Sequence, residues 1–175
     1  KSLYSGDGYF QFKLPRTRFF KIGETLKNCW DVKVYVSNLF NHHSGELIYS
    51  GYIQNIRSVG DAQEQAIVVE CVGYVTQFDY TPYKDGDDIS LSHSSADIVD
   101  IAKDIIDKYN DNQQHSVIDY TTDSVPASTG DTLSPSYNSL SIRRALNELF
   151  NNEDSKDACY VDSANVFHFF DGNSG

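Results

Sequence analysis

Apolar and polar residues alternate along most of the first half of the chain, which is the period of a β-strand with one buried face. The alternation predicts strands over residues 8–14 and 31–36, and a turn at residues 41–45 leads into a further strand over residues 47–53. Residues 66–74 are mostly apolar and β-branched, so this strand is expected at the centre of the sheet. The pattern favours a small antiparallel barrel of about five or six strands over a sandwich, because closure removes exposed strand edges.

The hydrophobic period changes to about 3.6 residues after the polar turn at residues 84–88. One face of the predicted helix carries Ile98, Ile101, Ala102, Ile105 and Tyr109. Ser94 or Ser95 is expected to cap this helix, and Asp97 in its first turn complements the helix dipole. A second helix is expected from about residue 139, with one apolar stripe formed by Ile142, Ala145, Leu146, Leu149 and Phe150.

Polar residues and two prolines dominate residues 110–138, which predicts a long exposed connection with one short strand at 116–120. Residues 158–162 and 165–170 predict a hairpin around Ser163 and Ala164. The predicted fold class is therefore mainly β with α (α+β). A small antiparallel β-barrel domain is expected over residues 1–88, followed by a smaller α+β domain with two helices over residues 89–175.

Composition and charge exclude several classes of protein. The formal net charge of −11 and the pI of about 4.6 disfavour direct nucleic-acid binding, because the average field repels phosphates. No apolar run approaches the roughly 18 residues of a membrane-spanning helix. The three cysteines have no CxxC spacing, which argues against a disulfide framework or a zinc knuckle, and Cys71 is expected to be a small buried hydrophobe. Because the chain begins with Lys1 and has no methionine, we expect it to be a piece of a longer protein.

The candidate metal ligands have simpler structural explanations. His42 and His43 lie in a predicted turn without a third ligand at a recognisable spacing, so solvent-facing imidazoles or a contact loop are expected. Asp85, Asp87 and Asp88 surround a glycine but lack the spacing and the closing glutamate of a calcium loop. A solvated acidic turn is the better interpretation.

The residues that could act in catalysis also have structural explanations or lack the required motif. The helix carboxylates Asp97, Asp100, Asp104 and Asp107 fall mostly opposite the isoleucine stripe, as expected for a wetted face. The chain has no Gly-x-Ser-x-Gly motif, and the glycines of residues 5–8 precede a strand instead of a helix. We therefore predict no catalytic, cofactor-binding or metal-binding residues, no cofactor, and a protein that is not an enzyme. The 12 tyrosines, 10 phenylalanines and Trp30 are expected in core packing or subunit contacts, with a carbohydrate-binding groove as the alternative.

Two units of the sequence resemble one known family. The first is the order of the Ser50-Gly51-Tyr52-Ile53 strand, the strand ending Cys71-Val72-Gly73-Tyr74, and the isoleucine-rich helix, within residues 45–109. The second is the helix over 139–150 followed by the hairpin over 159–169. Together they resemble the start of baseplate-hub or tail-associated proteins of tailed phages, prophages and related contractile injection systems.

The resemblance implies a structural role in a tail baseplate hub or tail tip, linking the tail tube to distal tail proteins. It implies a homotrimer for the full-length protein, with a second barrel beyond residue 175, other tail or baseplate proteins as partners, and no membrane segment. The expected location is the virion after synthesis in the bacterial cytoplasm. The alternative function is a receptor- or carbohydrate-binding module at a phage tail or bacterial surface, and a peptidase or cell-wall hydrolase would need residues beyond this chain.

Overall fold

A computed structural model describes residues 8–15, 26–36, 45–60, 65–112, 117–151 and 157–172. Contacts within the chain form two compact units that divide between Tyr74 and Val75. The boundary drawn from the sequence, at residue 88, lies farther along the chain. The difference arises because Val75, Phe78 and Tyr83 belong to the hydrophobic core of the second unit.

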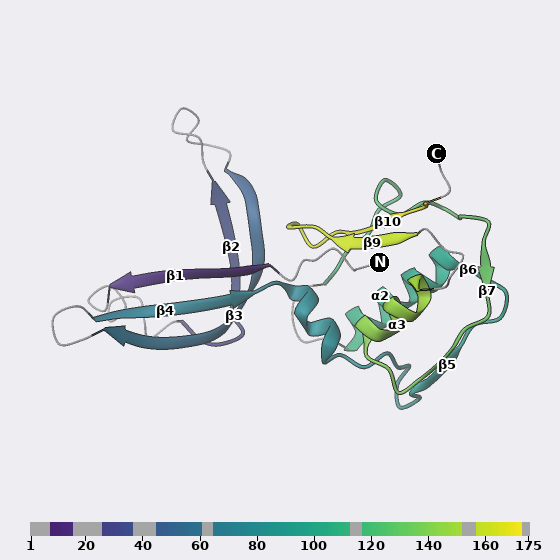
Figure 1. Cartoon of the computed structure of the whole chain (residues 1–175), viewed down its shortest axis with the longest axis horizontal. Helices are drawn as coiled ribbons and strands as arrows, with labels where there is room; N and C mark the ends of the chain where they lie inside the picture. The colour runs from purple at the N-terminus through teal and green to yellow at the C-terminus, as the bar shows by residue number, and fades with distance from the viewer. Residues whose placement is uncertain are drawn as a thin grey trace. The chain divides into compact units, whose positions relative to one another are not determined.

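The first unit is a curled antiparallel sheet (Figure 1). Its strands are β1 (Tyr9–Pro15), β2 (Asp31–Val36), β3 (Glu46–Gly60) and β4 (Gln65–Val72), in the spatial order β1-β4-β3-β2. The predicted strands and the central position of β4 are confirmed. The predicted closed barrel is not observed, because the described strands leave β1 and β2 as the two edges of an open half-barrel.

A bend in β3 produces the curl. Its first half pairs with β2 and its second half pairs with β4, as Figure 1 shows. The register shifts between Ile53 and Asn55, which marks a bulge at the bend. Beside this corner the Tyr74 hydroxyl donates a 2.6 Å hydrogen bond to Asp31 at the start of β2.

The two faces of the sheet differ in chemistry. One face buries Tyr49, Ile53, Ile67, Val69 and Cys71, with partly buried side chains from β1 and β2 around them. On the other face the Glu70 carboxylate accepts hydrogen bonds from the Asn55 amide at 3.0 Å and the Arg57 Nε at 2.9 Å. These bonds join β3 to β4 by side chains as well as by backbone.

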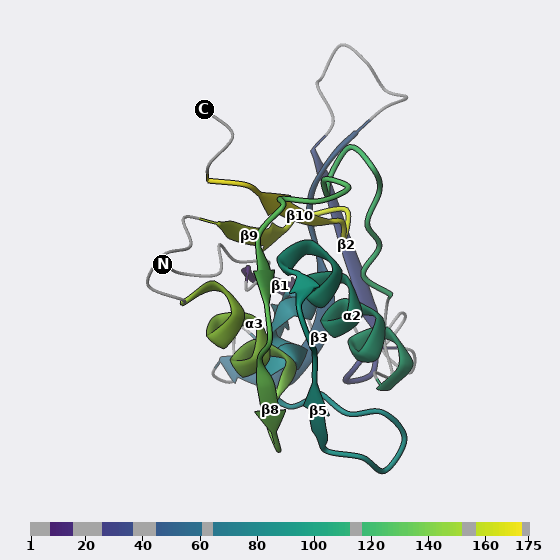
Figure 2. The same cartoon turned by 90° about the vertical axis from the view of Figure 1, so that its right-hand side faces the viewer.

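The second unit combines two α-helices with short strands. It begins at Val75, the second residue of the 3-10 helix η1 (Tyr74–Asp79). The elements that follow in chain order are β5 (Ser90–Ser92), β6 (Ala96–Asp97), α2 (Ile98–Asn112), β7 (Thr132–Leu133), β8 (Ser136–Asn138), α3 (Ile142–Phe150), β9 (Ala158–Val161) and β10 (Phe167–Phe170). Three two-stranded antiparallel sheets result: β5 with β8, β6 with β7, and β9 with β10. Figure 2 shows β5 beside β8 and the two helices beside each other.

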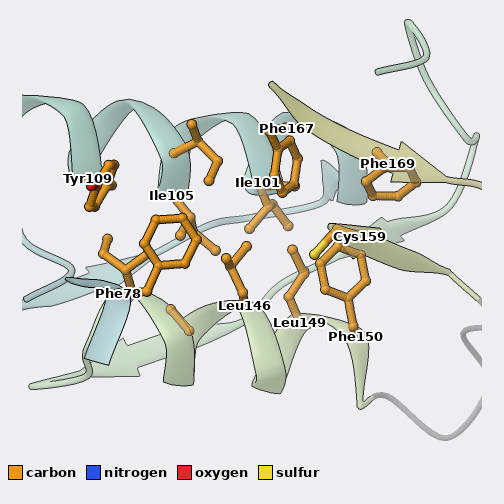
Figure 3. Packing of buried hydrophobic residues seen from close by; sticks show 14 of the residues in the cluster. Phe78, Ile101, Ile105, Tyr109, Leu146, Leu149, Phe150, Cys159, Phe167 and Phe169 are labelled. Atoms are coloured by element: carbon orange, nitrogen blue, oxygen red, sulfur yellow. The ribbon is translucent and has the colours of Figure 1, made fainter. Parts of the chain in front are cut away.

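The core of this unit lies between the helices and the β9–β10 hairpin (Figure 3). The isoleucine stripe of α2 and the apolar stripe of α3 are both buried, as predicted. From the hairpin, Cys159, Phe167 and Phe169 point into the same core. The predicted helices and hairpin are therefore confirmed.

The predicted long exposed connection over residues 110–138 is wrong in part. It contains β7 and β8, and it buries Ile118, Val125 and Tyr137. The strand expected at residues 116–120 is instead an isolated parallel bridge between Asp119 and Val166 among the described residues. The segment is polar in sequence, yet its few apolar side chains enter the core.

The helix caps also differ from expectation. Asp97, and not Ser94 or Ser95, accepts the backbone N–H of Val99 at 2.9 Å where α2 begins. Ser95 instead has a left-handed backbone with φ 48° and lies ahead of β6. At the second helix, Ser141 is the N-cap of α3 and accepts from the Arg144 N–H.

Candidate functional site

A small apolar groove opens on the surface of the second unit. It has a volume of about 250 Å³ and is lined by Tyr80, Pro82, Tyr83, Ile89, Ser139, Leu140 and Ser141. We call it the Tyr80 groove. Two stretches far apart in the sequence form it, residues 80–89 and residues 139–141.

Backbone hydrogen bonds hold these two stretches together. The Tyr83 N–H donates to the Leu140 carbonyl at 2.8 Å, and the Ile142 N–H donates to the Thr81 carbonyl at 3.0 Å. The Ser139 N–H donates to the Ile89 carbonyl at 2.9 Å. Because each wall is fixed by main-chain bonds, the groove exists before any ligand binds.

The floor of the groove is Tyr83, which is 1% exposed. Its hydroxyl donates to the Asp104 carboxylate of α2 at 2.5 Å and lies 2.9 Å from His93 Nε2. The Tyr137 ring packs edge-on against Tyr83 at 5.4 Å. Burial, reinforced by the hydrogen bond to Asp104, raises the pKa of Tyr83 far above its usual value, so the phenol stays protonated.

The rim of the groove is apolar and open to solvent. Tyr80 is 83% exposed and Ile89 is 47% exposed, although both side chains are hydrophobic. The hydroxyl of Ser141 is already used in capping α3. The lining therefore offers apolar contact and few free polar groups, which suits the binding of an apolar side chain.

Carboxylates along α2 and directly before it organise the surrounding loops. Asp97 accepts from the side chain of Ser128 and from the Gly130 N–H at 3.2 Å, besides capping the helix. The Tyr120 hydroxyl contacts both oxygens of Asp107 at 3.1 Å. Within the part of the chain that the structure describes, the contact of Asp100 is a 4.0 Å approach to Lys103. The face that the sequence predicts to be solvent-exposed therefore anchors neighbouring segments through three of its four aspartates, Asp97, Asp104 and Asp107.

The other candidate residues are placed as follows. Asp85 and Asp88 exchange backbone hydrogen bonds in a turn, and Lys108 pairs with Asp85 at 3.0 Å. His42, His43 and residues 5–7 lie outside the described residues. Across the described ranges, no group of three His, Cys, Asp or Glu side chains could hold a metal ion. Likewise, the helices that the structure describes include none long and apolar enough to cross a membrane.

The outer face of the β9–β10 hairpin carries a stack of rings. Tyr160 stacks on His168 at 4.5 Å and on Phe170 at 5.5 Å, with interplanar angles of 7° and 13°. His168 Nε2 lies 2.9 Å from the Asp162 carboxylate. Burial by itself raises the pKa of Asp162, but hydrogen bonds from Val166, His168 and Ala164 lower it by more, so the pKa lies below its usual value. Phe170 remains 53% exposed.

Sequence reasoning did not find the Tyr80 groove. The only local signal was the aromatic and proline pattern of residues 80–83, which have no periodic secondary structure. At the opposite wall, the sequence of residues 139–141 predicts the start of a helix. Only the tertiary hydrogen bonds reveal that the two stretches adjoin.

Comparison with known proteins shows a likeness in fold to a solved structure. No family model matches the chain, and no curated protein matches it. Among solved structures, the fold is similar to that of the tail protein from Neisseria meningitidis MC58, with a TM-score of 0.50 and 11% sequence identity. The likeness covers 71% of this chain and 34% of that chain, so this chain spans about a third of the tail protein's length. The chain therefore shares its fold with part of a tail protein.

Proposed function

We propose that this chain is a structural component of the tail of a phage or prophage-derived particle, in the baseplate hub or tail tip, where it links the tail tube to distal tail proteins. The supporting observation is the likeness in fold to a solved tail protein over 71% of the chain. The proposal places the protein in the virion, after synthesis in the bacterial cytoplasm, with other tail or baseplate proteins as its partners.

The proposal includes a homotrimer of the full-length protein. Among the strands that the structure describes, β1 and β2 are the edges of the curled sheet, and this supports the proposal because an edge strand readily pairs with another chain. Trp30 precedes the edge strand β2, and Tyr35 and Val36 end it; all three are large exposed apolar side chains. A subunit contact along β2 would cover this apolar surface and extend the half-barrel towards closure.

The proposed role involves no catalysis and no direct binding to nucleic acid. The Tyr80 groove supports a binding role. Its buried hydroxyl, that of Tyr83, is hydrogen-bonded to the Asp104 carboxylate and stays protonated, so it is not poised to act as a base or nucleophile. The net charge of −11 would repel DNA that passes through a tail, so the DNA would not adhere to this protein.

Immunogold electron microscopy with antibodies raised against the 175-residue chain tests the location. We expect gold label at the end of the tail distal to the capsid, and antibody absorbed with the purified chain is the control. Label on the capsid, or none on intact and disrupted particles, would contradict the proposal. Light scattering of the full-length protein tests the assembly: a mass of three chains is expected, and a stable monomer argues against the trimer.

A second candidate function is a receptor- or carbohydrate-binding module on the same tail or on a bacterial surface. The observation that favours it is the ring stack of Tyr160, His168 and Phe170, since the face of an exposed ring can pack against a sugar. Glycan-array binding that is lost in Phe170→Ser would support this role. Absence of binding to every glycan would remove it.

A further inference from the structure

We infer that the Tyr80 groove is the docking site for a positively charged segment of another protein, which inserts one large apolar side chain into it. That this partner is a neighbouring tail protein rests on the proposed function. The chemistry of the groove does not depend on that assignment, because it follows from the lining residues and the charges around them.

The size of the groove fits a single side chain. Pockets that enclose drug-sized ligands measure about 300–1,000 Å³, whereas this groove measures about 250 Å³. Its apolar rim would be covered when a side chain enters. Tyr80 is the most exposed of the large hydrophobic residues that the structure describes, at 83%. A tyrosine ring left in water next to a preformed apolar hollow is typical of an interface anchor.

The groove is rigid enough to recognise a partner without rearrangement. Its walls are joined by the Tyr83 to Leu140 and Ser139 to Ile89 hydrogen bonds, of 2.8 and 2.9 Å. Its floor is fixed from below by the contact between Tyr83 and Asp104 of α2. Binding would therefore cost little conformational entropy in this part of the chain.

The charges favour a basic partner. The turn at residues 84–88 carries three aspartates and one lysine, and its last two aspartates, Asp87 and Asp88, are exposed directly before Ile89 of the rim. The cation that reaches this turn, Lys108, is paired with Asp85. Arg144, in the first turn of α3, is an exposed cation but does not line the groove. The whole chain has a net charge of −11, which opposes docking of a second copy.

Three capped tripeptides test the inference by nuclear magnetic resonance titration of the isotopically labelled 175-residue chain. The probes are Lys-Phe-Lys, Lys-Ala-Lys and Glu-Phe-Glu, each acetylated and amidated. Lys-Phe-Lys is expected to shift the backbone amide signals of residues 80–83, 89 and 139–141. Lys-Ala-Lys should bind at least about tenfold more weakly, because it lacks the inserted ring. Glu-Phe-Glu should bind about threefold more weakly at low salt, and the difference should shrink in 0.5 M salt.

Single substitutions on the exposed rim locate the site. Tyr80→Ser and Ile89→Ser should each weaken Lys-Phe-Lys binding about fivefold or more, while both variants keep the dispersed spectrum of a folded chain. Val117→Ser is the matched control, because Val117 is an exposed hydrophobic residue that does not line the groove. Asp87→Asn should weaken Lys-Phe-Lys and not Glu-Phe-Glu.

The outcomes separate cleanly. Signal shifts confined to other parts of the chain would overturn the docking site. So would a Tyr80→Ser variant that binds Lys-Phe-Lys as tightly as the Val117→Ser variant and the wild-type chain do. Glu-Phe-Glu binding as tightly as Lys-Phe-Lys would overturn the basic partner. None of these results depends on whether antibodies label a tail, so failure of the docking site and failure of the tail assignment are distinguishable.

Discussion

Gly51 and Val72 approach each other backbone to backbone at the corner of the curled sheet. A β-carbon added to Gly51 would lie 2.2 Å from the Val72 carbonyl oxygen and 2.5 Å from the Tyr49 hydroxyl. The corner therefore accepts only glycine without moving β3 away from β4. This steric requirement explains why a glycine interrupts an otherwise strong strand sequence.

Replacing Gly51 with alanine is expected to destabilise the sheet unit. The carbonyl oxygen belongs to the backbone and cannot rotate away, so β3 or β4 must shift, at a cost of about 1–3 kcal/mol. Urea unfolding followed by circular dichroism measures the change. Gly8→Ala is the control, because its β-carbon would meet only the edge of the Tyr49 ring, at 3.3 Å. Equal stability of Gly51→Ala and the wild-type chain would contradict the close approach.

Asp97 is expected to stabilise the second unit through the start of α2. Loss of an N-cap side chain costs about 0.5–2 kcal/mol, and Asp97→Ala also releases the loop at Ser128 and Gly130. The free energy of unfolding at pH 7 measures the loss. Asp100→Ala removes the same charge near the same end of α2, where the described residues give Asp100 a 4.0 Å contact with Lys103, so it should change the stability by less than about 0.5 kcal/mol.

The same carboxylate predicts a dependence of stability on pH. Burial raises the pKa of Asp97, but hydrogen bonds from Ser128, Val99, Gly130 and Thr129 together lower it below its usual value. A group whose pKa is lowered by folding stabilises the folded state above its unfolded pKa, about 3.9 for Asp, and this stabilisation is lost as the pH falls. The free energy of unfolding should fall below about pH 4 more steeply for the wild-type chain than for Asp97→Ala. Parallel pH profiles would refute the argument.

Tyr83 and Asp104 are expected to be energetically coupled beneath the Tyr80 groove. Tyr83→Phe removes the donor of the 2.5 Å hydrogen bond, and Asp104→Asn removes the charge of the acceptor. Direct partners in a hydrogen bond show coupling energies of about 0.5–3 kcal/mol, and the partly exposed Asp104 favours the lower end. A double-mutant cycle of unfolding free energies measures this coupling. The exposed Tyr120–Asp107 pair provides the control cycle, in which a smaller coupling is expected.

The three cysteines should differ sharply in reactivity. Cys29 is exposed, whereas Cys71 and Cys159 are buried, and burial raises the pKa of Cys71 to about 11 and that of Cys159 to about 12. Because the thiolate is the reactive form, Ellman's reagent at pH 8 should modify Cys29 rapidly and the other two only after unfolding. Cys29→Ser should abolish the rapid phase. Rapid reaction of a second thiol would show that one of the cores is open.

The elements of this fold are encoded locally. The side chains of Ile98, Ile101 and Ile105 fall on one face by the geometry of a helix alone. Likewise, alternation along residues 31–36 places successive side chains on opposite faces of a strand. Such patterns need no knowledge of what covers them. For this reason the four strands of the first unit, both helices and the C-terminal hairpin could be predicted from the sequence, whereas the short strands β5 to β8 were not.

The connections between elements depended on the tertiary structure. Ser94, Ser95 and Asp97 are all suitable caps by residue type, and the cap is decided by where α2 begins. Pairing of β6 with β7 keeps Ala96 and Asp97 extended, so the helix starts at Ile98 and Asp97 accepts the Val99 N–H. Barrel closure is similar, since pairing of β1 with β2 joins residues distant in sequence, and the described strands remain open. The Tyr80 groove arises from hydrogen bonds between residues 81–89 and 139–142. Hydrophobic periodicity reports which face of an element is buried, but not which distant segment lies against it, so the sequence determined the elements while tertiary packing decided the corner, the caps and the groove.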